Sequence, residues 1–311
     1  MLDYKIHTFL TVCSCMNFTK AAQLLNMTQP GVSQHIHKLE EEYEAVLFTY
    51  QEKKLSLTEA GEKLLLAART MEHDITLLKA KMNPVQNQIH RLSFGATLTI
   101  GEFVMPSVLS SFLKAHPDTH IKMTINNTAY LLHALKEGLI DFALIEGYFE
   151  KSNYDYTILD HVSFLPVASP DFIGKNLQYN SSIKKTPLNV SDLFSHRLFV
   201  REDGSGTKEI LSRYLQEHNF SMQDFSSVTE INSMHAIKEM VCHGNGMTFL
   251  YRPVVEKELK SGVLTIIPLK NWNLSHEFTM IRLKGSIFPS EYSIFYETMI
   301  AALNIQNSFA K

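Results

Sequence analysis

The spacing of apolar residues between Asn17 and Lys38 predicts two short helices joined by a tight turn. The first helix has one apolar face at helical spacing, formed by Phe18, Ala21, Ala22, Leu24 and Leu25. Asn26 and Met27 break this pattern before a second one begins. A helix over residues 2–16, with its own apolar face, precedes the pair and is expected to pack on it.

The second helix is predicted from Thr28 to Tyr43. Thr28 is a favourable N-cap, and Pro30 falls in the first turn, where its missing N–H costs little. One stripe turns inward, formed by Val32, Ile36 and Leu39. The outer face carries residue types that can reach base edges and phosphates in a major groove, namely Thr28, Gln29, Pro30, Ser33, Gln34, His37 and Lys38. We interpret the segment as a helix-turn-helix, the alternative being an ordinary antiparallel helix pair.

Two short apolar runs follow, over residues 45–50 and 55–57, around a polar tip. This pattern predicts a β-hairpin, or wing, whose tip residues Lys53 and Lys54 could contact phosphates. The alternative is a pair of solvated loop lysines.

A long helix is predicted from Thr58 to about Met82, where Pro84 stops it. At ~1.5 Å per residue it would be roughly 37 Å long. Its apolar residues recur at spacings of four and three, at Leu64, Ala68, Met71, Ile75, Leu78 and Met82. Such a seam between two domains predicts pairing with a second copy, which would present two recognition helices to a pseudo-palindromic DNA site.

From residue 89 onward the pattern changes to strands that alternate with helices. Strands are expected at 89–97, 120–126, 141–146, 162–168, 197–201, 225–230, 247–250, 264–268 and 277–283, and helices at 102–115, 128–136, 205–218, 233–243, 253–260 and 290–303. This order is typical of parallel sheets with flanking helices. Two such units predict two lobes with a cleft between them.

Composition and charge restrict the function only in part. The chain has 311 residues, enough for more than one domain, and its formal net charge of −3 argues against general affinity for nucleic acid. Acidic residues also cluster directly after Lys38, although a DNA-facing surface can still be locally basic. The absence of an export signal and of a membrane-spanning apolar run, together with three cysteines, predicts a cytoplasmic protein without disulfides.

These features together resemble the LysR-type transcriptional regulators. The resemblance rests on Phe18–Ala22, Thr28–Pro30, Val32–Ser33, Ile36, Lys38–Glu40, Leu47–Phe48 and Leu57–Gly61, and continues through Asp141–Leu144, Gly204–Thr207 and Gly244–Gly246. It implies an α/β protein with a winged helix-turn-helix at 1–57, a linker and dimerisation helix at 58–87, and an effector domain of periplasmic-binding-protein type at 88–311. Lobe I is then 88–161 plus 269–311, and lobe II is 162–268.

The resemblance also implies a homotetramer in which a small effector between the lobes alters oligomer geometry and DNA bending; contact with RNA polymerase is left open. Family members often carry arginines in the recognition helix and wing, where this chain has Gln34, His37 and Tyr50. We therefore expect weak phosphate anchoring, with affinity that depends on dimer geometry.

Polar residues gather where strands end and helices begin. The segment Asp203–Lys208 lies between a strand and a helix, and its N–H groups and hydroxyls suit an anion, although a plain helix cap uses the same residue types. In open α/β sheets ligands bind at the carboxyl ends of strands. The expected effector residues are Thr97, Thr99, Asn126, Asn127, Thr128, Glu146, Ser205, Gly206 and Thr207, with a plain N-cap as the alternative for Thr128.

The run Thr97–Gly101, with Pro106 and Ile145–Gly147, resembles the branch of the family that senses small inorganic anions, including sulfur oxyanions. No obvious inward arginine or lysine is expected in the pocket. Glu146 would repel an anion if it faced the ligand, so an organic carboxylate or an amino acid remains an alternative.

The sequence does not support an enzyme. It lacks a Gly-x-Ser-x-Gly elbow, a His-Glu-x-x-His motif and paired Cys-x-x-Cys motifs, so we expect no catalytic residues, no metal and no cofactor. His35 and His37 fall on different faces of a helix. A DNA-bending protein without an effector is the remaining alternative.

Overall fold

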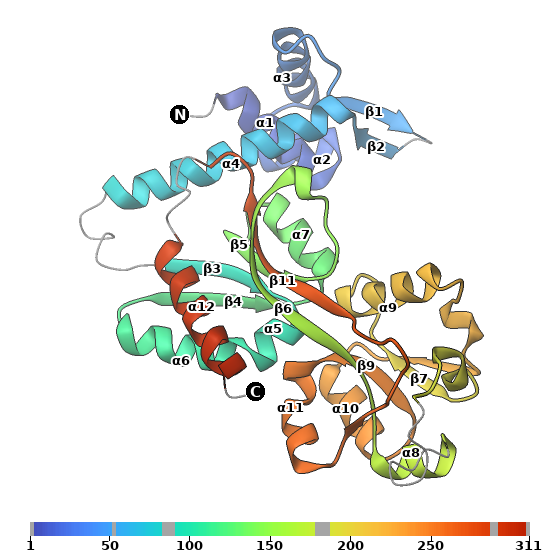
Figure 1. The fold of residues 1–311 in the computed structure, drawn as a ribbon. Helices are drawn as coiled ribbons and strands as arrows, with labels where there is room; N and C mark the ends of the chain where they lie inside the picture. Colours follow the sequence, from blue (N-terminus) through green and yellow to red (C-terminus); the bar gives the residue numbers. More distant parts are fainter. Residues whose placement is uncertain (1–2, 52–53, 83–90, 178–186, 287–291, 309–311) are drawn as a thin grey trace.

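A computed structural model describes residues 3–51, 54–82, 91–177, 187–286 and 292–308. It has a small N-terminal domain, a long helix and a two-lobed α/β domain (Figure 1). Within these ranges no helix is long and apolar enough to cross a lipid bilayer.

The N-terminal domain is the predicted winged helix-turn-helix. It contains helices α1 (Tyr4–Cys15), α2 (Phe18–Leu24) and α3 (Gln29–Glu42), followed by the antiparallel strands β1 (Phe48–Gln51) and β2 (Lys54–Leu57). Thr28 caps α3 as expected, because its side chain accepts a hydrogen bond from the N–H of Gly31 at 3.2 Å. The inward stripe of α3 is buried against α1 and α2 in one apolar core.

Helix α4 (Glu59–Met82) follows, and Thr58 caps it by accepting from the N–H of Gly61. Its predicted apolar seam divides into two parts. Ala68 is buried in the core of the N-terminal domain, with Leu64 packed beside it. Met71, Leu78 and Met82 are 56%, 45% and 75% exposed. The second half of the seam is therefore the part that this chain leaves uncovered.

Helix α4 also rests on lobe I of the α/β domain. Arg69 pairs with Glu72 on its own helix and with Glu137 across the boundary, at 2.9 and 2.8 Å. The hydroxyl of Thr70 donates to the carbonyl of Lys284, and that of Ser286 donates to Asp74. The linker helix and lobe I are thus joined by polar contacts.

Lobe I contains the parallel strands β3 (Arg91–Ala96), β4 (His120–Ile125) and β5 (Phe142–Glu146). Phe94, Phe142 and Leu144 face one core cluster, which includes residues of α6 and α12. Ala143 and Ile145 alternate with them and face α7. Both faces of β5 are therefore buried, as expected for a central parallel strand. The helices are α5 (Leu98–Phe103), α6 (Met105–Ala115), α7 (Thr128–Lys136) and α12 (Ser293–Ser308).

The single helix expected at 102–115 was wrong. The chain is helical from Leu98, and the helix is divided at Val104 into α5 and α6. Pro106 occupies the first turn of α6, where it cannot continue the hydrogen bonding of a preceding helix. As a result, Thr97 and Thr99 lie at the beginning of a helix directly after β3.

Two long strands join the lobes. β6 (Tyr154–Ala168) and β11 (Ser275–Leu283) are antiparallel partners and run side by side from lobe I toward lobe II (Figure 1). The sequence predicted only residues 162–168 of β6. Its first half has exposed and half-buried positions among the buried ones, so it lacks the continuous apolar run of a buried strand.

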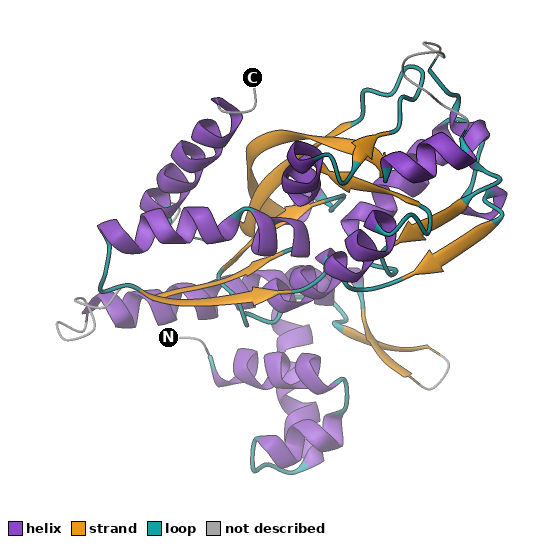
Figure 2. Ribbon diagram, turned by 90° about the horizontal axis from the view of Figure 1, so that it is seen from below, coloured by secondary structure: helices purple, strands orange, loops and turns teal. Residues whose placement is uncertain are grey.

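Lobe II contains β7 (Arg197–Val200), β8 (Ser227–Glu230), β9 (Met247–Tyr251) and the short β10 (Thr265–Ile266), which pairs with β6. Its helices are α9 (Gly206–Glu217), α10 (Met234–Cys242), α11 (Arg252–Ser261) and α8 (Pro170–Asn176), which the sequence did not predict. Helices flank the strands of both lobes (Figure 2). The strand order β4-β3-β5-β11-β6-β9-β7-β8 makes one path through the two lobes.

Candidate DNA-binding face and effector site

The outer face of α3 is polar and open to solvent. Thr28, Gln29, Pro30, Gln34, His37 and Lys38 are exposed, and Ser33 is half-buried. The amide of Gln29 donates to the hydroxyl of Ser33 at 2.9 Å, which holds these two side chains together one helical turn apart. The structure therefore places all seven predicted contact residues of this helix on accessible surface.

The acidic residues after Lys38 have structural partners. Glu40 accepts a hydrogen bond from the N–H of Leu47 at 2.8 Å, and Glu42 pairs with Lys5 of α1. The hydrogen bond to Glu42, followed by that to Asp3, raises the pKa of Lys5 to about 12. The acidic end of α3 is thus partly neutralised within the domain.

The two histidines of α3 face different ways, as predicted. The ring of His35 contacts the hydroxyl of Thr8 at 2.9 Å, whereas His37 is exposed and lies 3.5 Å from Glu41. In the wing, Lys54 is exposed, and Lys53 lies outside the described residues.

The expected effector residues meet where the two lobes touch, and Glu146 is at the centre. Its side chain is 2% exposed, and the hydroxyl of Thr97 donates to its carboxylate. Thr128 donates to its main-chain carbonyl at 3.0 Å. Thr99 is completely buried, and its hydroxyl lies close enough to the same carboxyl to act on its pKa, but among the described residues it has no partner with hydrogen-bond geometry.

Burial raises the pKa of Glu146, while the hydroxyls of Thr97 and Thr99 and the charge of Arg201 act in the opposite direction. The neutral form of this carboxyl is therefore favoured relative to a glutamate in water. A neutral Glu146 does not repel an anion. The expectation that Glu146 opposes an anionic effector is therefore weakened.

The facing wall is the beginning of α9. Ser205 precedes the helix and is 4% exposed, but its side chain makes no capping hydrogen bond. A Cβ on Gly206 would lie 2.3 Å from the main-chain oxygen of Glu146, and one on Gly147 would lie 2.7 Å from Cα of Gly206. Glycine is needed at these positions because the two backbones almost touch.

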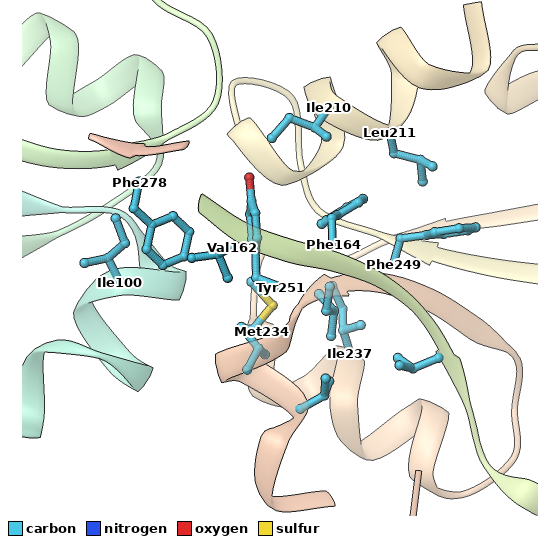
Figure 3. Packing of buried hydrophobic residues seen from close by; sticks show 14 of the residues in the cluster. Ile100, Val162, Phe164, Ile210, Leu211, Met234, Ile237, Phe249, Tyr251 and Phe278 are labelled. Carbon is cyan, nitrogen blue, oxygen red and sulfur yellow. The ribbon is translucent and has the colours of Figure 1, made fainter. Parts of the chain in front are cut away.

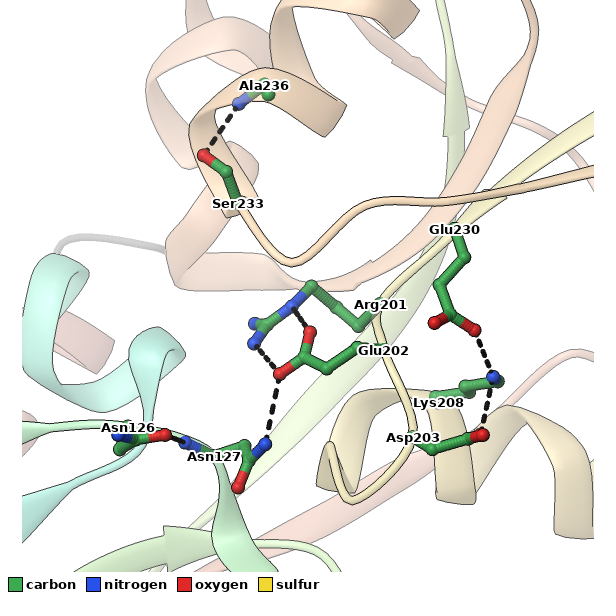
Figure 4. A network of polar contacts seen from close by, with 9 residues as sticks. All are labelled: Asn126, Asn127, Arg201, Glu202, Asp203, Lys208, Glu230, Ser233 and Ala236. Atoms are coloured by element: carbon green, nitrogen blue, oxygen red, sulfur yellow. Dashed lines mark hydrogen bonds and ion pairs between the residues drawn. The ribbon is translucent and has the colours of Figure 1, made fainter. Parts of the chain in front are cut away.

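The asparagines after β4 act differently from Thr128. Asn127, not Thr128, caps α7, since its side chain accepts from the N–H of Tyr130 at 3.0 Å. Asn127 also donates to Glu202 of lobe II at 3.3 Å (Figure 4). Asn126 accepts from the N–H of Asn127 and so orders this turn. The plain N-cap reading of Thr128 was wrong, and Asn127 bridges the lobes.

Two further residues of lobe II belong to the junction and were missed from the sequence. Arg201 is 2% exposed and pairs with Glu202 at 2.8 Å, so the expectation of no inward arginine was wrong (Figure 4). Tyr251 is completely buried beside Phe164 and Phe278, and its hydroxyl has no hydrogen-bond partner in the described part of the chain (Figure 3). Burial, followed by the charge of nearby Glu146, raises the pKa of Tyr251. In sequence, Arg201 could have been noticed as a cation directly after a buried strand.

The lobes are closed on one another. Beside the junction, a cavity of about 10 Å³ is bordered by Arg201 and Thr207, and the hydroxyl of Thr207 has no partner within the described ranges. Such a volume holds about one water molecule, and all the residues that line this cavity belong to lobe II. In this region, three hydroxyls that are more than nine-tenths buried thus lack a hydrogen-bond partner among the residues that the structure describes, those of Thr99, Thr207 and Tyr251.

A winged helix-turn-helix joined by a long helix to a two-lobed α/β domain defines a DNA-binding regulator with a ligand-binding type of domain. Comparison with known families agrees: residues 4–62 match the bacterial regulatory helix-turn-helix protein, lysR family, and residues 86–303 match the LysR substrate binding domain. The chain belongs to the LysR family of transcriptional regulators.

Similar proteins are also named as regulators. The HTH-type transcriptional regulator CysL of Bacillus subtilis is 28% identical over 277 residues, which are 89% of each chain. A probable RuBisCO transcriptional regulator of Thalassiosira pseudonana is 25% identical and covers 97% of each chain. ArgP from Mycobacterium tuberculosis shares the fold with a TM-score of 0.70 at 19% identity, covering 97% of each chain. LysG from Corynebacterium glutamicum, solved with bound effector Arg, has a TM-score of 0.68 at 19% identity, covering 97% of this chain and 98% of its own.

Proposed function

We propose that this regulator senses a small inorganic oxyanion, such as a sulfur oxyanion, at the junction of its lobes. The observation that carries the proposal is the set of buried hydroxyls without partners, of which Thr99 lies in lobe I and Thr207 in lobe II. A buried hydroxyl without a partner costs free energy, and an oxyanion supplies several acceptors at once. Ser205 and the N–H groups at the beginning of α9 add further donors.

The charges at the junction are compatible with an anion. Arg201 is buried there, although it is shared with Glu202, and the carboxyl of Glu146 is shifted toward its neutral form. An amino acid is the second candidate, because Glu146 in its ionised form could accept an ammonium group. An effector-independent DNA-bending protein is the third, and a search for any effector distinguishes it from the first two.

In this proposal the outer face of α3 reads base edges and Lys54 contacts phosphates. The exposed part of α4, at Met71, Leu78 and Met82, pairs two copies, and two such pairs form the tetramer. Effector binding would alter the separation of the lobes and, through the polar contacts between α4 and lobe I, the spacing of the recognition helices.

Calorimetry with sulfite, sulfate, thiosulfate and small carboxylates tests the effector. Thr99→Val and Thr207→Val together remove two hydroxyls and conserve shape, so we expect the affinity for the best anion to fall more than tenfold. Thr76→Val is the matched control on α4, because this exposed hydroxyl bonds only within its own helix. Absence of binding by every anion, or binding that survives the double variant, would refute the oxyanion proposal.

Footprinting of the adjacent intergenic DNA tests the other half of the function. Gln29→Ala is expected to weaken binding to the footprinted operator by about tenfold, since a good bidentate base contact is worth ~1–3 kcal/mol. Binding to random DNA should change little. Equal losses on both DNAs would mean that Gln29 does not read bases.

A further inference from the structure

A second cavity lies beside the two strands that connect the lobes. Its volume is about 340 Å³, within the range of small-molecule sites. The walls come from the segment after β5 and from β6 and β11, and the charged and aromatic residues that line them are Tyr148, Phe149, Lys151, His161, His276 and Glu277. None of the side chains proposed to hold the oxyanion lines this cavity, although Gly147, which does, also lies against Gly206 at the junction.

One carboxylate and two basic side chains lie together in this cavity, without close pairing. Lys151 Nζ is 3.5 Å from Glu277 Oε2, and His161 Nε2 is 3.9 Å from Glu277 Oε1. These distances exceed those of strong charge-assisted hydrogen bonds. His161 and Glu277 are register partners on neighbouring strands, so the sheet itself holds them opposite one another. Lys151, His161 and Glu277 can therefore each form a shorter polar contact with a ligand.

The proton on His276 can be placed. Its Nδ1 lies 3.2 Å from the main-chain carbonyl of Glu277, and a carbonyl only accepts, so Nδ1 carries the hydrogen. Burial lowers the pKa of His276, which favours the neutral ring. The other ring nitrogen, Nε2, is then an acceptor, and among the residues that the structure describes it has no hydrogen-bond partner. The cavity therefore offers acceptors at Glu277 and His276 and a cation at Lys151.

Aromatic rings form the other side of this cavity. The ring of Tyr148 stands edge-on to His276, with centroids 5.0 Å apart. Its face is covered by the guanidinium of Arg213, whose carbon is 3.6 Å from the ring centroid. Arg213 belongs to α9 of lobe II and is paired with Glu209. Tyr148 therefore connects the cavity to the helix that begins at the junction of the lobes.

We infer that this cavity binds an amino acid in its zwitterionic form. Its carboxylate would bind Lys151 and His161, its ammonium would bind Glu277 and Nε2 of His276, and its side chain would lie against Tyr148 and Phe149. A simple carboxylate leaves both acceptors unused, and a simple amine leaves Lys151 unused. Because the site spans both connecting strands and touches α9 through Tyr148, its occupancy restrains the relative rotation of the lobes.

The test is calorimetric titration of the full-length protein with L-phenylalanine and L-leucine. Each is compared with its analogue without the ammonium group and its analogue without the carboxylate. We expect both analogues of the better ligand to bind at least tenfold more weakly. Glu277→Gln should reduce the affinity for the amino acid at least tenfold, and Lys151→Met should do the same. Lys175→Met is the control, since this lysine pairs only with Asp171 on the surface of α8.

This test can fail or succeed independently of the test of the oxyanion proposal. The variant Thr99→Val, Thr207→Val removes hydroxyls at the junction and should leave amino-acid binding unchanged. If neither amino acid binds, or if binding persists in both Glu277→Gln and Lys151→Met, the inference is wrong whatever the anions do. If the junction variant abolishes amino-acid binding, the amino acid occupies the junction and the inference is also wrong.

Discussion

Replacing Gly206 by alanine should force the lobes apart. The added Cβ would lie 2.3 Å from the main-chain oxygen of Glu146 and 3.0 Å from Cα of Gly147. Ordinary contact begins near 3.4 Å, so the backbones must separate by about 1.1 Å. Both neighbours are main-chain atoms, so no side-chain rotation can relieve the contact. Overpacking of this kind costs ~1–3 kcal/mol.

Gly174→Ala is the matched control. This glycine lies within α8, and a Cβ there would meet nothing within 4 Å. Alanine is favoured over glycine in helices by ~0.5–1 kcal/mol, so this variant should be slightly more stable than the parent protein. Both variants replace glycine by alanine in lobe II helices, and they differ in what the new methyl group meets.

Thermal unfolding measures the difference. For a domain of this size each kcal/mol corresponds to roughly 2–4 °C in Tm. We expect Gly206→Ala to unfold below the parent protein and Gly174→Ala at or above it. Anion affinity should also fall in Gly206→Ala, because Thr207 moves away from Thr99. If Gly206→Ala is as stable as Gly174→Ala and binds anions normally, the direct backbone contact between the lobes is refuted.

Two further predictions concern buried charge. Burial raises the pKa of Glu146 above its ordinary value of 4.5, so the stability that this group contributes is complete below about pH 4.5 and is lost as the pH rises toward the folded pKa. Urea unfolding at several pH values should therefore show a fall in stability with rising pH that Glu146→Gln reduces, and identical pH profiles would contradict the shift. At the other boundary, Arg69 and Glu137 are 11% and 17% exposed. Arg69→Met should cost ~1–3 kcal/mol in chemical denaturation, because it leaves a mostly buried carboxylate unpaired. Lys63→Met, which removes an exposed pair with Glu59, should cost less than ~1 kcal/mol; equal effects would mean that the contact between α4 and lobe I adds no stability.

The elements that could be predicted are those with a strong local signal. Helix α3 combines a cap at Thr28, a proline in its first turn and an apolar stripe, so the sequence placed it almost to the residue. Helix α7 was also placed correctly, although its cap is Asn127. The sequence missed α8 and misjudged two other elements, which have mixed patterns. β6 is half-exposed in its first part, and the break between α5 and α6 depends on how Val104 and Pro106 are accommodated.

The residues of the candidate site also fall into two groups, those that the sequence could indicate and those that it could not. Thr97, Thr99 and Glu146 could be named because each stands at the end of a strand, a position that sequence order reveals. Arg201 and Tyr251 stand at strand ends too, and this position is their one local signal. It does not show whether such an arginine or tyrosine points into the junction or toward solvent. Their burial comes from the packing of lobe II against the connecting strands.

The sequence alone thus determined most of the local elements, because caps, turn residues and apolar periodicity act over a few residues. Its resemblance to the LysR-type regulators indicated the class of protein. Only the tertiary structure decided which polar groups lose water. Three features arise where segments far apart in sequence come together. They are the raised pKa of Glu146, the hydroxyls of Thr99 and Tyr251 that lack partners among the described residues, and the close approach of Gly147 to Gly206. Desolvation and close packing depend on all the residues that surround a group in space, whereas the local sequence pattern depends only on its neighbours along the chain.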